Sequence, residues 1–112
     1  MVATITNLLL EPGATFQRDI ALVDDDGQPL LVSGYTANGA IKSDYYANSF
    51  LAVFQTNLVD GTLSLRLEAN VTSVFPYGME PCVYDVYMSN GTNTFRIAEG
   101  LVVIDPGTGV NI

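Results

Sequence analysis

The acidic side chains are the most abundant ionisable groups in the chain, and few basic residues accompany them. The 112 residues include twelve Asp and Glu, four Lys and Arg, and no His. Without histidine the usual general base near neutral pH is missing, and neither a Ser-His nor a Cys-His nucleophile can form. Two carboxylates could act as a glycosidase pair, but these acids fall mostly at turns or on predicted outer faces. We therefore expect no enzymatic activity and no catalytic residues.

Metal and cofactor sites are not favoured by the motifs either. The run Asp24-Asp25-Asp26-Gly27 could begin a calcium loop, but the spaced ligands and the later Glu of that motif are missing. Asp and Gly are ordinary turn formers, so we interpret the run as a turn. Cys82 is the only cysteine, and a lone Cys is commonly buried and inert. The sequence predicts neither a bound metal nor a cofactor.

The balance of charge excludes two classes of partner. The formal net charge is -8, whereas nucleic-acid binding needs a basic footprint and anionic membranes attract basic segments. No stretch approaches the roughly 20 apolar residues of a membrane span, and the start has no secretory signal, so we expect a soluble protein made in a cytoplasm. Charged residues make up only 14%, below the usual quarter or so, which indicates that some surface faces protein.

Tyrosines supply the candidate binding residues. Tyr45 and Tyr46 are adjacent in a polar segment, 44–49, where a role in the core is weakest. Tyr87 lies on the outward side of a predicted strand. Because Tyr is enriched at protein interfaces, we interpret Tyr45, Tyr46 and Tyr87 as partner-binding residues. Two alternatives stay open: packing within the loop, and stacking against a sugar ring.

Strands must position these side chains, and the segment 82–104 is the best defined. Its residues 89–93, SNGTN, predict a tight turn between two strands. Centring the turn there puts Asp85 opposite Arg96, which predicts a structural charge pair across the hairpin. The same register gathers an apolar set on the opposite face: Tyr84, Val86, Met88, Phe95 and Ile97. A slip of one residue would destroy both features.

The rest of the chain alternates short strands with turn signals. Before the hairpin we expect strands at 3–10, 15–23, 35–43, 50–56 and 62–68, and one helical turn at 69–75. About seven such strands predict an all-β fold, a single antiparallel β-sandwich that is immunoglobulin-like. The domain should span 1–105, with a flexible C-terminal tail at 106–112.

Two details of these strands carry further expectations. Gly39, inside a strand, predicts a bulge or a close backbone approach. Residues 50–54 are apolar on both faces, so that strand should be either central and covered twice or packed against a partner.

Taken in order, the motifs resemble those of small virion proteins of tailed bacteriophages. They are similar to the immunoglobulin-like N-terminal domain of baseplate upper proteins. The pieces that carry the resemblance are 12–16 (PGATF), 26–30 (DGQPL), 33–37 (SGYTA), 41–42 (IK), 60–65 (DGTLSL), the turn holding Thr72, 83–86 (VYDV) and 96–103 (RIAEGLVV). The resemblance implies a structural role in a phage particle.

From these observations we expect a non-enzymatic structural protein of a phage particle. It would decorate or cement the capsid, or form part of the tail or baseplate. The implied partners are phage capsid or tail proteins, and the chain would act as a homo-oligomer or in many symmetric copies. Its location would be the virion, after synthesis in the host cytoplasm. A carbohydrate- or surface-binding β-sandwich module is the alternative function.

Overall fold

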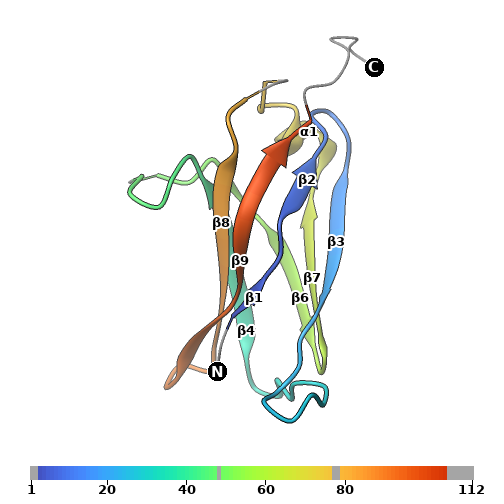
Figure 1. The fold of residues 1–112 in the computed structure, drawn as a ribbon, viewed down its shortest axis with the longest axis vertical. Helices are drawn as coiled ribbons and strands as arrows, with labels where there is room; N and C mark the ends of the chain where they lie inside the picture. The colour runs from blue at the N-terminus through green and yellow to red at the C-terminus, as the bar shows by residue number, and fades with distance from the viewer. Residues whose placement is uncertain (1–2, 48, 77–78, 106–112) are drawn as a thin grey trace.

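The computed structural model describes residues 3–47, 49–76 and 79–105, and the predicted tail at 106–112 lies outside them. The described chain forms two β-sheets packed face to face, with one short helix at one end (Figure 1), which confirms the predicted all-β sandwich. In chain order the elements are β1 (Thr4–Ile5), β2 (Leu8–Leu10), β3 (Phe16–Ala21), β4 (Thr36–Lys42), β5 (Ala52–Val53), β6 (Gln55–Val59), β7 (Thr62–Leu67), α1 (Ala69–Thr72), β8 (Cys82–Ser89) and β9 (Thr94–Ile104).

The order of strands is that of an immunoglobulin-like domain. Among the described residues, a large sheet of six strands runs β1-β9-β8-β4-β5, with β2 also on β9, and a small sheet of three runs β3-β7-β6. In an immunoglobulin domain the third, sixth and seventh strands share one sheet, and the second, fourth and fifth share the other. In this chain β4, β8 and β9 take the first set of places, and β3, β6 and β7 take the second. Two predicted strands are each divided in two here. The first is split into β1 and β2, and the segment 52–59 switches sheets between β5 and β6.

The first strand corrects the prediction of a purely antiparallel sandwich. β1 and β2 pair with β9 in parallel, with Thr4 opposite Ala98 and Leu8 opposite Val102. Blue and red-orange segments from the two ends of the chain therefore lie side by side in Figure 1. Strands this far apart in sequence need no hairpin turn between them, so local patterning does not fix their relative direction.

A close approach of the first strand to Gly100 of β9 accounts for the break between β1 and β2. Between them the chain passes so close to β9 that a Cβ on Gly100 would collide with the carbonyl oxygen of Thr6. The Asn7 carboxamide replaces a backbone acceptor there, because its Oδ1 accepts a hydrogen bond of 3.1 Å from the N–H of Leu101. Gly100 thus permits the first strand to stay on the edge of the sheet.

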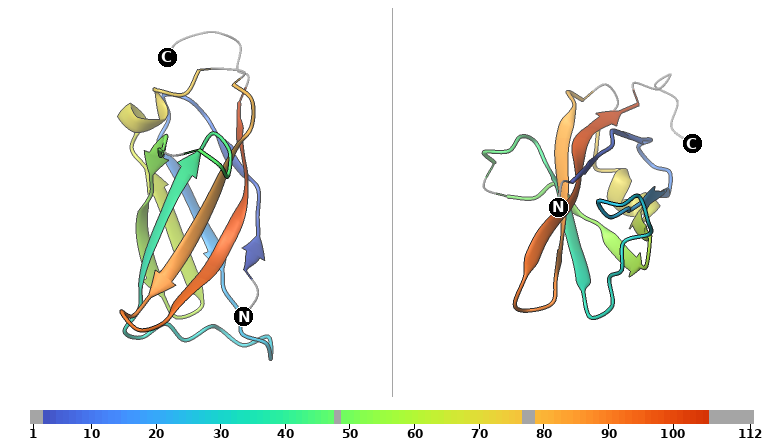
Figure 2. Two further views of the ribbon diagram at one scale, coloured as in Figure 1. Left: turned by 90° about the vertical axis from the view of Figure 1, so that its left-hand side faces the viewer. Right: turned by 60° about the horizontal axis from the view of Figure 1, so that its bottom comes forward.

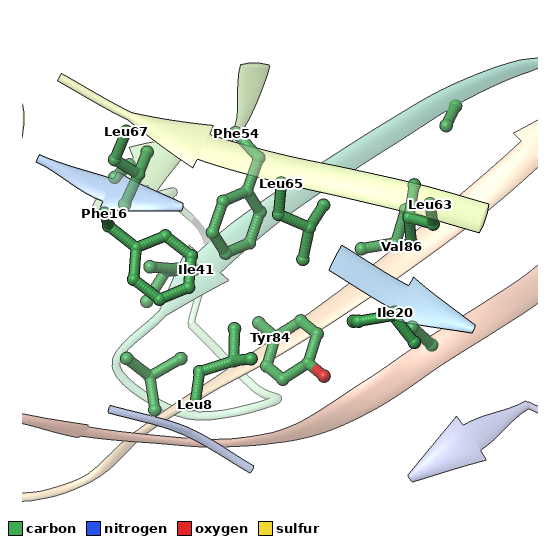
Figure 3. Close-up of a cluster of buried hydrophobic side chains, with 14 of the residues drawn as sticks. Leu8, Phe16, Ile20, Ile41, Phe54, Leu63, Leu65, Leu67, Tyr84 and Val86 are labelled. Atoms are coloured by element: carbon green, nitrogen blue, oxygen red, sulfur yellow. The ribbon is translucent and has the colours of Figure 1, made fainter. Parts of the chain in front are cut away.

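The core lies between the sheets and is built from alternate positions of their strands (Figure 3). β7 shows the predicted alternation, with Leu63, Leu65 and Leu67 buried. The Tyr84 ring is 1% exposed and meets Phe54 edge to face, with ring centroids 5.9 Å apart. Its hydroxyl donates a hydrogen bond of 2.5 Å to the Thr6 carbonyl. Burial raises the pKa of Tyr84 to about 12, so the phenol stays protonated.

Close packing at Gly39 confirms the expectation for that glycine. Gly39 lies opposite Val86 on the buried side of β4. A Cβ placed on it would lie 2.6 Å from Cγ2 of Val86 and 3.1 Å from the Asp85 carbonyl oxygen. The absence of a side chain therefore lets β4 approach β8 closely.

The predicted helical turn is present and closes one end of the sandwich. α1 contains Thr72, which is fully buried. The Thr72 hydroxyl donates to the carbonyl oxygen of Ala14 at 2.7 Å and accepts from the N–H of Gly13 at 3.1 Å. These bonds join the connection after β7 to the turn between β2 and β3.

The closing hairpin has its turn where the sequence predicted it, but its register is different. Ser89 lies opposite Thr94, so residues 90–93 form the turn, and Arg96 lies opposite Tyr87. Ile97 is an extra residue in a β-bulge, after which Asp85 lies opposite Glu99. A bulge of this kind adds one unpaired residue to one strand and is not visible in an alternating pattern.

The predicted pair of Asp85 with Arg96 is therefore wrong. Arg96 forms its ion pair along its own strand, with Nη1 3.2 Å from Oε2 of Glu99. The predicted buried face is nevertheless observed for Tyr84, Val86, Met88 and Ile97. Phe95 is the exception: it is 38% exposed and contacts the Tyr35 ring at 6.2 Å between centroids.

Candidate binding face

The two outer surfaces of the sandwich differ in chemistry. On the small sheet most outward side chains are polar, and several of them bond to one another; Val59 is an exposed exception. The Ser64 hydroxyl donates to Oδ1 of Asp19 at 2.7 Å, and Arg66 Nη1 donates to Oε1 of Gln17 at 3.3 Å. This surface satisfies its own polar groups and suits water.

The large sheet presents an apolar outer surface instead. We call the outward side chains of its strands, together with the loop 43–51, the outer face. Ten of the fifteen large exposed hydrophobic side chains in the described residues belong to it. They are Ile5, Leu9, Tyr45, Tyr46, Phe50, Leu51, Val53, Tyr87, Leu101 and Val103. A concentration of exposed apolar side chains on one face is a marker of an interaction site.

The described residues of the loop, 43–47 and 49–51, shape the outer face. They join β4 to β5 and extend away from the sandwich beside β4 and β8 (Figures 1 and 2). Phe50 of the loop and the following Val53 are each 61% exposed. The loop is anchored where it rejoins the sheet, because the N–H of Leu51 donates to the carbonyl of Ile41 at 2.7 Å.

A groove of about 440 Å³ lies between this loop and the strands. The strand register explains its position: the small Ala40 lies opposite Asp85, and Asn38 lies opposite Tyr87. Ala40 leaves space above the sheet, and larger side chains surround that space. The groove is lined by Asn38, Gly39, Ala40, Lys42, Phe50, Val53, Asp85 and Tyr87. Its volume is within the range of small-molecule sites, roughly 300–1,000 Å³.

Two cations lie over aromatic rings at the groove. Nζ of Lys42 is 5.5 Å from the centroid of the Phe50 ring. The Arg96 guanidinium is 5.6 Å from the Tyr87 ring centroid, and its Nε donates to the Tyr87 hydroxyl at 3.3 Å. Hydrogen bonds to Tyr87 and then Glu99 raise the pKa of Arg96 above its usual value. Both rings are therefore held in place by a neighbouring charge.

Two charged groups of the groove form no ion pair or hydrogen bond within the described residues. Across residues 3–47, 49–76 and 79–105, no hydrogen bond or ion pair involves the Asp85 carboxylate or the Lys42 ammonium. Asp85 and Lys42 are diagonal neighbours on β8 and β4, because Asp85 lies opposite Ala40 and Lys42 opposite Val83. The groove thus offers one free carboxylate and one free ammonium to a partner.

The predicted binding residues reach the outer face to different extents. Tyr87 lines the groove and is 37% exposed. Tyr45 is 53% exposed and lines a smaller pocket of about 40 Å³, which shares Lys42 and Asp85 with the groove. Tyr46 is 94% exposed on the loop. Their role in binding stays a prediction.

Sequence reasoning missed the side chains that complete the groove. Asn38 and Lys42 are outward positions of β4, and alternation along 36–42 could have found them. Phe50 and Val53 belong to the segment that is apolar on both faces. The structure places β5 at the edge of the large sheet, not in its centre. Of the two expectations for that segment, the one of a central, twice-covered strand is therefore wrong.

The aspartate run and the cysteine that the sequence singled out occupy a turn and the core. Oδ1 of Asp24 accepts hydrogen bonds of 2.9 Å from the N–H groups of Asp26 and Gln28, as a turn requires. No cluster of three or more metal-ligating side chains occurs within the described residues. Cys82 is buried, and burial raises the pKa of its thiol, which disfavours the reactive thiolate.

Comparison with known proteins assigns no family and no function to this chain. No family model matches the chain, and no curated protein matches it in sequence. None of the helical segments in the described part of the chain is long and apolar enough to cross a membrane. The fold and the outer face are therefore the basis for a functional hypothesis.

Proposed function

We propose that this protein is a non-enzymatic structural component of a phage particle, and that it binds protein partners through the outer face. The observation that carries the binding role is the concentration of exposed apolar and aromatic side chains on the outer face of the large sheet. The assignment to a phage particle rests on the order of sequence motifs described above. Capsid decoration or cementing and a place in the tail or baseplate are both compatible with such a role.

The composition of the outer face suits a protein interface. The centres of interfaces are enriched in aromatic residues and depleted in charge, and the outer face combines Tyr45, Phe50 and Tyr87 with few ions. Tyr and Phe each bury about 150–250 Å² when covered, so a few of them dominate binding. A repeated particle lattice would cover this surface in every copy.

Mass spectrometry of purified particles tests the role directly. The chain is quantified against the major capsid and tail-tube proteins. Hundreds of copies would place it on the capsid lattice, and a small multiple of three or six would place it in the tail or baseplate. Complete absence from particles would refute the structural role.

A carbohydrate-binding module is the second candidate, and the groove is the observation that favours it. Sugars bind by stacking on aromatic rings and by hydrogen bonds to carboxylate and carboxamide groups. The groove presents Tyr87 and Phe50 beside Asp85 and Asn38. A glycan array with the wild-type chain and Tyr87→Ala would test this reading: glycan binding that the substitution abolishes would favour it over a protein partner.

A further inference from the structure

The charges of the protein are distributed unevenly between the outer face and the remaining surface. The outer face carries Lys42 and Arg96 against Asp44, Asp85 and Glu99, a formal charge of -1. The other two cations and nine acids leave -7 elsewhere. A strongly basic partner would be drawn to the remaining surface. A second copy of this acidic chain would meet the least repulsion at the outer face.

Lys42 and Asp85 of one copy are complementary in charge to Asp85 and Lys42 of a second copy. A two-fold symmetric contact places residue i of one copy on residue j of the other, and j on i. With a two-fold axis between Lys42 and Asp85, each ammonium would meet the partner copy's carboxylate. Two equivalent ion pairs would form from the two groups that lack a partner within one chain. A sugar hydroxyl can hydrogen-bond either group but neutralises neither charge.

We propose that the outer face is a homodimer interface, in which Lys42 of each copy pairs with Asp85 of the other. Tyr45, Phe50, Val53 and Tyr87 surround this pair of charges and would be covered with it. The molecule measures 45 × 26 × 21 Å, so a long face is comparable with the roughly 800 Å² that each partner buries in a stable complex. The inference rests on the proposed function and names the second copy as one partner of the outer face.

Reciprocal charge swaps test the interface. The molar mass of the wild-type chain is measured by analytical ultracentrifugation across a concentration series, and we expect a dimer. Lys42→Asp and Asp85→Lys should each weaken dimerisation by about tenfold or more, because each substitution makes two like-charge contacts. An equimolar mixture of the two variants should dimerise again, since both contacts become attractive. The chain carrying both substitutions should also dimerise.

Controls separate the interface from general effects of charge. Arg66→Asp reverses a charge on the outer surface of the small sheet and should leave the dimer intact. Circular dichroism of every variant verifies that the β-sandwich is folded. A wild-type chain that stays monomeric up to about 1 mM, the concentration at which association is worth only about 4 kcal/mol, would overturn the proposal. Single swaps that are not rescued in the mixture, or a monomer that binds a glycan in the groove, would overturn it too.

The dimer and the particle role can fail separately. A chain that is found in purified particles but is monomeric in solution refutes the dimer and leaves the structural role. A chain that dimerises by the reciprocal pair but is missing from particles supports the interface and refutes the phage role.

Discussion

Replacing Tyr84 by Phe should change both the stability of the sandwich and its response to alkali. The Tyr84 hydroxyl donates to the carbonyl of Thr6, at the point where the first strand passes closest to Gly100 of β9. Tyr84→Phe keeps the ring against Phe54 and leaves that carbonyl without its donor. An unsatisfied buried acceptor costs about 1–3 kcal/mol. At pH 7 we therefore expect the free energy of unfolding to fall by about 1–2 kcal/mol.

Raising the pH toward 12 should instead lower the stability of the wild type more than that of the variant. Burial holds the pKa of Tyr84 at about 12 in the folded protein, against 10.0 for the free group. The raised pKa means that between pH 10 and 12 the folded state binds more protons than the unfolded state. Stability from this group is complete below pH 10 and is lost as the pH rises toward 12. The loss in the wild type is about 1.4 kcal/mol at pH 11 and about 2.3 kcal/mol at pH 12.

The variant lacks this phenol and escapes the loss, so the two stability curves should converge and cross near pH 11. Urea denaturation of both proteins from pH 7 to pH 12, followed by circular dichroism, measures the difference. Every other side chain is the same in both proteins, so its contribution cancels in the difference. A difference in unfolding free energy that stays constant from pH 8 to pH 12 would refute the assignment of the raised pKa to Tyr84.

Three further substitutions test the packing, the closure at one end and the outer face. Gly39→Ala should lower the free energy of unfolding by about 1–3 kcal/mol, because its Cβ would lie 2.6 Å from Val86 Cγ2. Gly27→Ala is the control: its Cβ would have nothing within 4 Å, and its φ of +80° should cost only about 1 kcal/mol in the same urea titration. Equal losses would contradict the steric reason. Thr72→Val removes the bonds to Gly13 and Ala14 and should lower the melting temperature by about 5–10 °C, whereas Thr92→Val at the exposed turn should leave it unchanged; an unaltered melting temperature for Thr72→Val would refute the anchoring role. Tyr45→Ala with Tyr46→Ala should keep the fold and weaken assembly into particles, with Val59→Ala on the small sheet as the control. Loss of folding, measured by circular dichroism, would show that these tyrosines belong to the core.

Most strands could be predicted from the sequence because alternation is a local property. The segment 62–68 alternates leucines with polar residues, and β7 spans Thr62–Leu67 with that alternation buried and half-buried. The turn at 90–93 could be predicted because Asn and Gly favour turn conformations whatever the rest of the chain does. Features of this kind require no knowledge of the neighbouring strand.

Pairing between strands was harder to predict because it depends on contacts distant in sequence. The observed turn, with Ser89 opposite Thr94, already places Arg96 opposite Tyr87, and the bulge at Ile97 then shifts the partner of Asp85 by one further residue, to Glu99. The parallel position of β1 and β2 includes a close approach of Thr6 to Gly100 that only the folded chain reveals. Tyr87 could be proposed as a binding residue from its type and outward position. The groove beside it could not, because it depends on Ala40 being opposite Asp85.

The contrast between the two outer surfaces bears on why the apolar one persists. The same chain places Asp19, Ser64 and Arg66 outward on the small sheet, so its 48% of hydrophobic residues does not force apolar groups into water. On the large sheet, Val53, Leu101 and Val103 occupy equivalent outward positions where polar residues would serve solubility better. The acidic charge on the remaining surface offsets that cost by keeping copies apart in other orientations. An apolar face on an otherwise repulsive molecule leaves one favoured direction of approach, which is the property that an ordered assembly of identical copies requires.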